Sequence, residues 1–166
     1  SAQSVSGSGG AASPSLQNLL LEEVAQLRDF LVLLENEQQA LAGGDVERLL
    51  PLAAEKNELL RRLAQLGEAR GKALLAGGLT TDRQGMEGWL ERHPEPAGAR
   101  RVWQELLTLA EKAGALNRTN GSLIATRLAN NQQALSTLMA AANQAALYGP
   151  DGQARPVGGG RRLDSV

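Results

Sequence analysis

The chain has 166 residues, which is enough for one domain with a substantial core. Its 17 Lys and Arg residues are balanced by 18 Asp and Glu residues, so no net positive field attracts nucleic acid or an anionic membrane surface. The absence of cysteine excludes disulfide and thiol chemistry, and with one Phe, one Tyr and two Trp the core is expected to consist of Leu and Ala.

The pattern of residues divides the chain into three parts. Residues 1–13 are mostly Ser, Gly and Ala without the regions of a signal peptide, and they predict a disordered leader. Residues 14–147 show helical patterns and predict one helical bundle, whereas residues 148–166 predict a flexible tail. No apolar run approaches the ~20 residues that span a bilayer, so we expect no membrane insertion. A chain without cysteine fits a reducing compartment, and we expect a cytoplasmic location.

The first helix is expected from Ser13 to about Ala42, because Ser13 can cap it and Pro14 suits its first turn. Its apolar seam alternates steps of four and three residues, as in helices that pack along their length. Gly43 and Gly44 are expected to end it. The seam consists of Leu20, Val24, Leu27, Leu31, Leu34, Gln38 and Leu41, and the residues that widen it to the breadth a bundle needs are Leu16, Leu19, Phe30 and Leu33.

The second helix is expected to begin after Asp45 as its cap. Pro51 either kinks its first turns or marks its true start. Because so few residues connect the two helices, they should form an antiparallel hairpin. Lys56 and Arg70 interrupt its leucine line, either to select one alignment of the helices or to leave a partly wet groove for a partner. The seam consists of Leu49, Leu52, Lys56, Leu59, Leu63, Leu66, Arg70 and Ala73.

Breakers between Gly77 and Gly98 predict a crossover segment, in which Thr81 caps a short helix that carries Met86, Trp89 and Leu90. Helical periodicity then returns from residue 99 to residue 147. The turn signal Asn120-Gly121-Ser122 leaves two possibilities, one continuous helix or a break that creates a fourth. The chain is therefore predicted to be all-α, an antiparallel bundle of three to four long helices with coiled-coil-like packing. The stripe of the last helix comprises Trp103, Leu106, Ala110, Ala113, Asn117, Asn120, Ile124, Asn131, Leu135, Leu138, Ala142 and Ala145.

Helix lengths point to a binding surface. The first two helices should span roughly 42 to 45 Å and an unbroken last helix about 73 Å, so the last helix should outrun the hairpin by roughly 30 Å, near residues 128–147. A stripe of apolar residues there needs cover, and its small Ala side chains would admit another helix closely. The alternatives are a fold-back as a fourth helix and a homodimer through the last helix. The predicted partner-binding residues are Leu128, Leu135, Leu138, Met139, Ala142, Ala146 and Leu147.

Nothing in the sequence predicts catalysis. His93 is the only histidine and lies in a polar loop, so it lacks the tuned partner of a general base. Carboxylates recur along the helices without the Glu-x-x-His pairs of a di-metal bundle, and we interpret them as a charged outer face. We therefore expect no enzyme activity, no metal and no cofactor. The carboxylates in question are Glu22, Glu23, Glu35 and Glu37.

Three stretches together resemble the FlgN family of flagellar type III export chaperones. The first is the run from Glu35 to Arg70, ENEQQALAGGDVERLL followed by EKNELLRRLAQLGEAR. The second is the Asn-rich run from Leu116 to Leu138, LNRTNGSLIATRLANNQQALSTL. The third is the helix exit from Leu147 to Gln153, LYGPDGQ. Pro51 and the Gly-rich tail after Gly158 depart from the family pattern.

The resemblance implies a cytoplasmic bacterial protein that binds the C-terminal helical segments of hook-filament junction proteins, also called hook-associated proteins. It implies that the last helix contacts this cargo and that Tyr148, just after that helix, docks to the export gate. Such a chaperone prevents premature association and delivers its cargo for export. The alternative that the residues leave open is a structural coiled-coil subunit of an export or other multiprotein apparatus.

Overall fold

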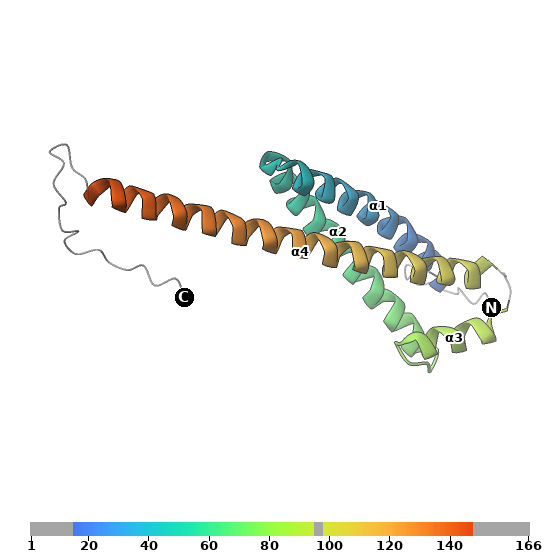
Figure 1. The fold of residues 1–166 in the computed structure, drawn as a ribbon. Coiled ribbons are helices and arrows are strands. Elements are labelled where there is room, and N and C mark those ends of the chain that lie inside the picture. Colours follow the sequence, from blue (N-terminus) through green and yellow to red (C-terminus); the bar gives the residue numbers. More distant parts are fainter. Residues whose placement is uncertain (1–14, 95–97, 148–166) are drawn as a thin grey trace, which may run out of the picture. The chain divides into compact units, whose positions relative to one another are not determined.

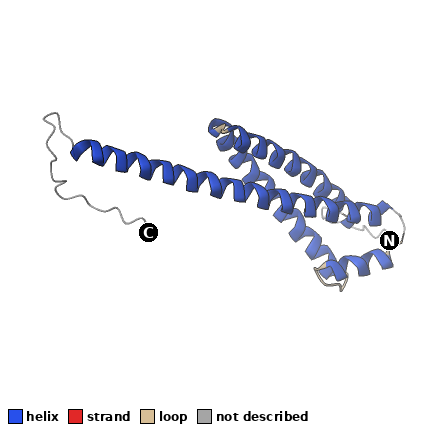
Figure 2. Ribbon diagram, in the orientation of Figure 1, coloured by secondary structure: helices blue, strands red, loops and turns tan. Residues whose placement is uncertain are grey.

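The structure is a computed structural model that describes residues 15–94 and 98–147. These ranges contain four helices: α1 (Leu16–Gly43), α2 (Val46–Ala76), α3 (Arg83–Arg92) and α4 (Gly98–Leu147) (Figure 1). Between them lie loops and turns, with no strand in the described part (Figure 2). The prediction of an all-α fold is confirmed. The predicted leader and tail, residues 1–13 and 148–166, lie outside the described residues.

Helix α1 begins two residues later than expected. The cap is Ser15, whose hydroxyl accepts a hydrogen bond from the Asn18 amide at 3.2 Å, and not Ser13. At the other end Gly44 adopts φ 68°, a left-handed conformation that glycine reaches without the steric cost of a side chain. Helix α1 therefore ends at the expected place.

Helices α1 and α2 form the predicted hairpin and lie side by side (Figure 1). Asp45 caps α2 as expected, accepting from the Arg48 amide at 3.3 Å. Pro51 lies inside α2, so the alternative in which the helix starts after Pro51 is wrong. Proline lacks only one intrahelical donor so close to the helix start, and the long apolar face that follows holds the helix in place.

Helix α3 is the crossover helix, and its cap is Asp82 instead of the expected Thr81. The Asp82 carboxylate accepts from the Gly85 amide at 3.0 Å. A Cβ atom at Gly85 would collide with the Thr80 carbonyl oxygen, so only glycine fits this turn. Met86 is fully buried, and the ring of Trp89 stacks on His93 with 4.4 Å between centroids. Burial of Met86 and Leu90 anchors the crossover to the core.

Helix α4 is one helix that continues through Gly121, so the predicted alternative of a break there is wrong. The contacts nevertheless divide the chain into two units, Ser1–Asn120 and Gly121–Val166. In the first unit, α1, α2, α3 and residues 98–120 share one apolar core. The fully buried Leu20, Leu34 and Leu74 each contribute roughly 1.5–3 kcal/mol.

The start of α4 runs parallel to α1 within the first unit. Gly98 lies near Gln17, Glu105 pairs with Arg28, and Asn120 bonds to Leu34. The predicted seams of α1 and α2 face the core or are half-buried at every position. The predicted stripe of α4 is wrong at Ala110 and Asn117, which are exposed.

Candidate functional site

The predicted binding residues of α4 are exposed wherever their side chains are described. Leu128, Leu135, Leu138 and Met139 are 58%, 59%, 67% and 47% exposed, and Ala142 is also exposed. The side chains of Ala146 and Leu147, and all of Tyr148, lie outside what the structure describes. Single exposed apolar side chains are common on protein surfaces, whereas a row of large ones along one helix marks a candidate binding surface.

These residues belong to a regular pattern within the second unit. The positions advance by four and three residues alternately, as in a helix that packs against another helix. We call this set the α4 stripe. Asn131 is its polar member, and Met139 flanks it. The α4 stripe consists of Ile124, Leu128, Asn131, Leu135, Leu138 and Ala142, and all six are exposed.

Two heptad lines of α4 have buried members in the first unit, and the α4 stripe continues one of them: Ile124, Asn131 and Leu138 follow the buried Trp103 at multiples of seven residues. The other line repeats every seven residues through the buried Ala99, Leu106, Ala113 and Asn120. Its next position is Arg127, a charged residue. Leu128, Leu135 and Ala142, the other half of the α4 stripe, lie one residue further along this repeat, so one of the two lines shifts by one residue after Asn120. The α4 stripe therefore shares one heptad line with the core-facing residues and departs from the other.

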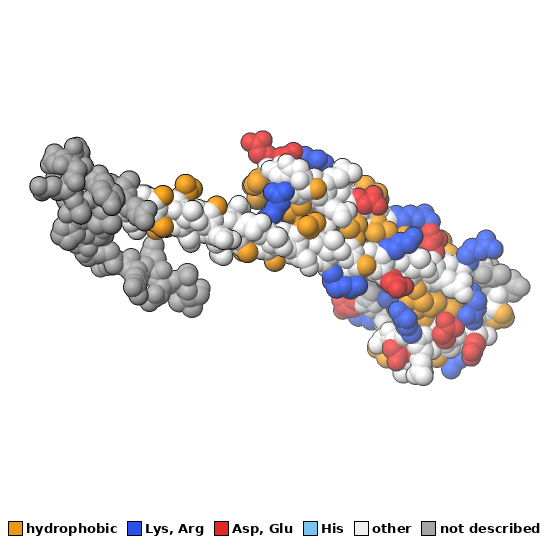
Figure 3. Space-filling view, in the orientation of Figure 1, with side chains coloured by type: hydrophobic (Ala, Val, Ile, Leu, Met, Phe, Trp, Pro, Cys, Tyr) orange, Lys and Arg blue, Asp and Glu red, His pale blue; other side chains and the backbone are white. Residues whose placement is uncertain are grey.

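Charge is absent from the sequence of this part of α4. Residues 128–147 contain no Asp, Glu, Lys, Arg or His, although 21% of the whole chain is charged. Their side chains are Ala, Leu, Met, Asn, Gln, Ser and Thr. Toward its C-terminal end the visible face of α4 is correspondingly orange and white in Figure 3, in contrast to the red and blue side chains over the first unit. An exposed helix usually has a charged face, so this composition is unusual.

Two buried carboxylates join the helices of the first unit. Glu23 accepts from Arg70 Nε at 2.9 Å, and the Arg70 guanidinium lies 5.4 Å from the centre of the Trp103 ring. Glu37 accepts from Lys56 Nζ at 3.1 Å and from Asn120 Nδ2 at 2.9 Å. Glu23 and Glu37 are each only 5% exposed, so the prediction that they belong to a charged outer face is wrong. Glu22 and Glu35 are exposed as predicted.

The spacing of the two ion pairs matches across the hairpin. Glu23 and Glu37 are two heptads apart on α1. Lys56 and Arg70, their partners, are also two heptads apart on α2. One alignment of α1 against α2 therefore satisfies both pairs. This geometry supports the interpretation of Lys56 and Arg70 as residues that select the alignment, in preference to a groove left for a partner.

Burial sets the ionisation of Glu23. Desolvation by burial raises the pKa of the Glu23 carboxyl above its ordinary value, and the hydrogen bond and charge of Arg70 offset only part of this rise. The buried Glu23 carboxyl is paired with Arg70, whose guanidinium in turn lies over the Trp103 ring. Its role is therefore structural, in accordance with its position between α1 and α2.

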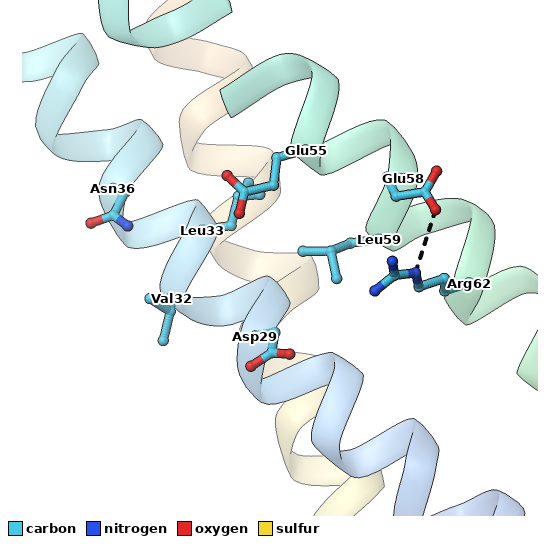
Figure 4. A pocket seen from close by; sticks show the side chains of 8 residues that line it. All are labelled: Asp29, Val32, Leu33, Asn36, Glu55, Glu58, Leu59 and Arg62. Carbon is cyan, nitrogen blue, oxygen red and sulfur yellow. Dashed lines mark ion pairs between the residues drawn. The ribbon is translucent and has the colours of Figure 1, made fainter. Parts of the chain in front are cut away.

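A cleft of about 400 Å³ lies between α1 and α2. Figure 4 shows its walls, where side chains of α1 face those of α2, and the ion pair between Arg62 and Glu58 at 3.4 Å. Three of its eight lining residues are carboxylates and three are apolar, and of the eight only Leu33 and Leu59 are buried. Exposed side chains of mixed charge are typical of a solvated helix face. The lining residues are Asp29, Val32, Leu33, Asn36, Glu55, Glu58, Leu59 and Arg62.

The described residues contain no group of three or more His, Asp or Glu side chains placed to hold a metal ion. His93 is exposed, and its Nδ1 lies 2.9 Å from the Trp89 carbonyl oxygen. Within the described ranges no helix combines the length and apolar character needed to cross a bilayer. Of the features described, the α4 stripe is the regular row of exposed apolar side chains.

Sequence similarity agrees with the fold. Residues 12–156 match the model of the FlgN family, described as FlgN protein. The chain belongs to the FlgN family. It is 32% identical over 142 residues to the flagella synthesis protein FlgN of Yersinia enterocolitica, and the match covers 84% of this chain and 89% of that protein. The FlgN of a serotype O:8 strain of the same species matches to the same extent.

A solved structure also resembles this FlgN-family chain. It is a crystal structure from Pseudomonas aeruginosa assigned as a flagella synthesis protein FlgN. The TM-score is 0.62 at 28% sequence identity, and the match covers 68% of this chain and 88% of the other. The resemblance to the FlgN family that the three sequence stretches indicated is thus confirmed.

Proposed function

We propose that this chain takes part in flagellum synthesis as a cytoplasmic export chaperone and binds without turnover. Its cargo is the C-terminal helical segment of the hook-filament junction proteins, which it protects from premature association and delivers to the type III export gate. Membership of the FlgN family, whose relatives are flagella synthesis proteins, supports the flagellar role. The cargo and the gate are inferred from the family resemblance.

The observation that carries the proposal is the exposed α4 stripe. It offers leucines about one helical turn or two apart on a helix with small alanines around them, a surface into which another amphipathic helix can pack. Burial of four such leucine-sized side chains yields on the order of 6–12 kcal/mol before ordering and association costs, which leaves room for micromolar binding. The helix needs no new nucleation, since it continues from turns that are packed in the first unit.

A chain that ends at Asn130 tests the assigned surface. Every described buried residue precedes Gly121, so the shortened chain should unfold in urea like the full chain. It should lose measurable affinity for peptides from junction-protein C-termini. Unchanged affinity would contradict the surface proposed here. A stable, concentration-independent oligomer in light scattering without cargo would instead favour a structural coiled-coil subunit.

Tyr148 carries the proposed gate contact. Replacement by Ala should leave peptide affinity within about twofold, because Tyr148 follows the α4 stripe and does not belong to it, while secretion of junction proteins falls in cells. Normal secretion by the Tyr148→Ala chain would remove this residue from the proposal and leave the cargo surface untouched.

A further inference from the structure

The uncharged stretch of α4 limits which partner it can accept. Residues 128–147 offer no ionic group, yet Leu128, Leu135 and Leu138 expose most of their side chains. A partner that covers this surface takes its own contacting groups out of water. A Lys, Arg, Asp or Glu buried there would lose hydration and meet no opposite charge in return.

Asn131 adds a second requirement. It stands on the α4 stripe between Leu128 and Leu135, so a helix that covers those leucines also covers its amide. A buried amide without a partner is unfavourable, whereas an amide or hydroxyl group across the interface satisfies it. A single polar residue within an apolar seam also selects one alignment of the two helices.

We propose that the α4 stripe from Leu128 to Ala142 accepts a neutral helical face, apolar with one hydrogen-bonding group opposite Asn131, and rejects charged faces of either sign. Arg127 lies just before this segment. This inference rests on the proposed function and specifies the part of the cargo that is recognised. Binding then depends on apolar contact, and salt has little effect on it because no pair of opposite charges is there to be screened. Charge complementarity, the usual source of salt-dependent affinity, is absent from residues 128–142.

Titration of the full chain with a synthetic junction-protein C-terminal peptide tests the inference. The dissociation constant should change less than twofold between about 0.05 M and about 0.5 M NaCl, a range over which the screening length falls several-fold. Leu135→Lys and Leu135→Glu should each weaken binding at least tenfold, and the neutral Leu135→Gln should weaken it less. Gln133→Lys is the matched control, since residue 133 is exposed and lies on the opposite side of the helix from the α4 stripe.

The outcomes separate the two claims. Weakening of tenfold or more at high salt, or full affinity in one of the two charged Leu135 variants, would overturn the neutral-face inference while leaving cargo binding intact. Absence of binding by the unaltered chain at either salt concentration would refute the proposed function and the inference together. Self-association that Leu135→Gln abolishes, and with which the peptide does not compete, would assign the stripe to a second copy and also overturn the inference. Circular dichroism of each variant checks that α4 remains helical.

Discussion

Asn120 donates its side-chain amide to the Glu37 carboxylate at 2.9 Å, from the last position at which α4 is buried within the described residues. The same amide nitrogen donates to the Leu34 carbonyl oxygen at 2.9 Å. Glu37 also accepts from Lys56, so one carboxylate connects α1, α2 and α4. An arrangement with two donors on one buried carboxylate satisfies a charge that the core would otherwise not tolerate.

Asn120→Ala should lower the free energy of unfolding by about 2 kcal/mol, since it removes two hydrogen bonds and leaves buried acceptors short of a donor. Urea denaturation of the full chain measures this change. Asn117→Ala is the control on the same helix: Asn117 is exposed, so its replacement should change stability by less than about 0.5 kcal/mol. Equal effects at the two positions would show that Asn120 contributes no more than a surface residue.

Arg70→Met should destabilise the chain by about 3 kcal/mol, because the Glu23 carboxylate loses its buried cation. The double variant Glu23→Leu with Arg70→Met should regain most of that loss, since apolar groups of similar size replace both charges. Arg62→Met, which removes an exposed ion pair with Glu58, should cost less than about 0.5 kcal/mol. A double variant no more stable than Arg70→Met alone would contradict this account of the pair.

The stability that depends on Glu23 should decrease as pH rises. Burial raises the pKa of this carboxyl, so the folded chain binds its proton more tightly than the unfolded chain does. The contribution is therefore fully present below the unfolded value of about 4.3 and is lost as pH rises through the folded value. Unfolding in urea at several pH values above 4 should show the unaltered chain losing stability relative to Glu23→Gln, and the opposite slope would mean that Arg70 lowers this pKa overall. The contributions of the other carboxyl groups are the same in the unaltered chain and in Glu23→Gln, so they cancel in this difference.

Gly121→Ala should stabilise α4 by about 0.5–1 kcal/mol, because Gly121 is helical and an added Cβ meets no atom within 4 Å. Slower amide exchange near residue 121 would report the gain. Gly85→Ala should instead destabilise the crossover by about 1–3 kcal/mol through its collision with the Thr80 carbonyl oxygen. A loss of helicity in Gly121→Ala would indicate that the chain needs glycine at that position.

The seams of α1 and α2 could be predicted because each is a heptad pattern of mostly Leu in one phase, bounded by Gly44 and Asp45. The seam of α4 could not, since one of its two heptad lines shifts by one residue after Asn120, and the other, from Trp103 to Ile124, passes over the exposed Ala110 and Asn117. The continuity of α4 through Gly121 depends on the good helix formers on either side, which outweigh the cost of one glycine.

The exposure of the predicted binding leucines could be anticipated from helix lengths, whereas the burial of Glu23 and Glu37 could not. A carboxylate on a helix is usually solvated, and only the alignment of a second helix decides whether a cation lies opposite. The one available signal was the equal spacing of Glu23 to Glu37 and of Lys56 to Arg70. The caps at Ser15 and Asp82 were missed because Ser13 and Thr81, their neighbours in sequence, are chemically equivalent candidates.

The equal spacing of the hairpin's charges also determines what happens when the two helices slip. A shift of α2 by one heptad in either direction would place the Glu23 carboxylate against Leu63 or Gly77, and Arg70 against Phe30 or Leu16. A shift of two heptads would form one ion pair and leave the other two charged residues without partners. Misaligned hairpins are therefore disfavoured here, although a hairpin with only leucines along its seam would tolerate them. The folding chain has one low-energy alignment of α1 against α2.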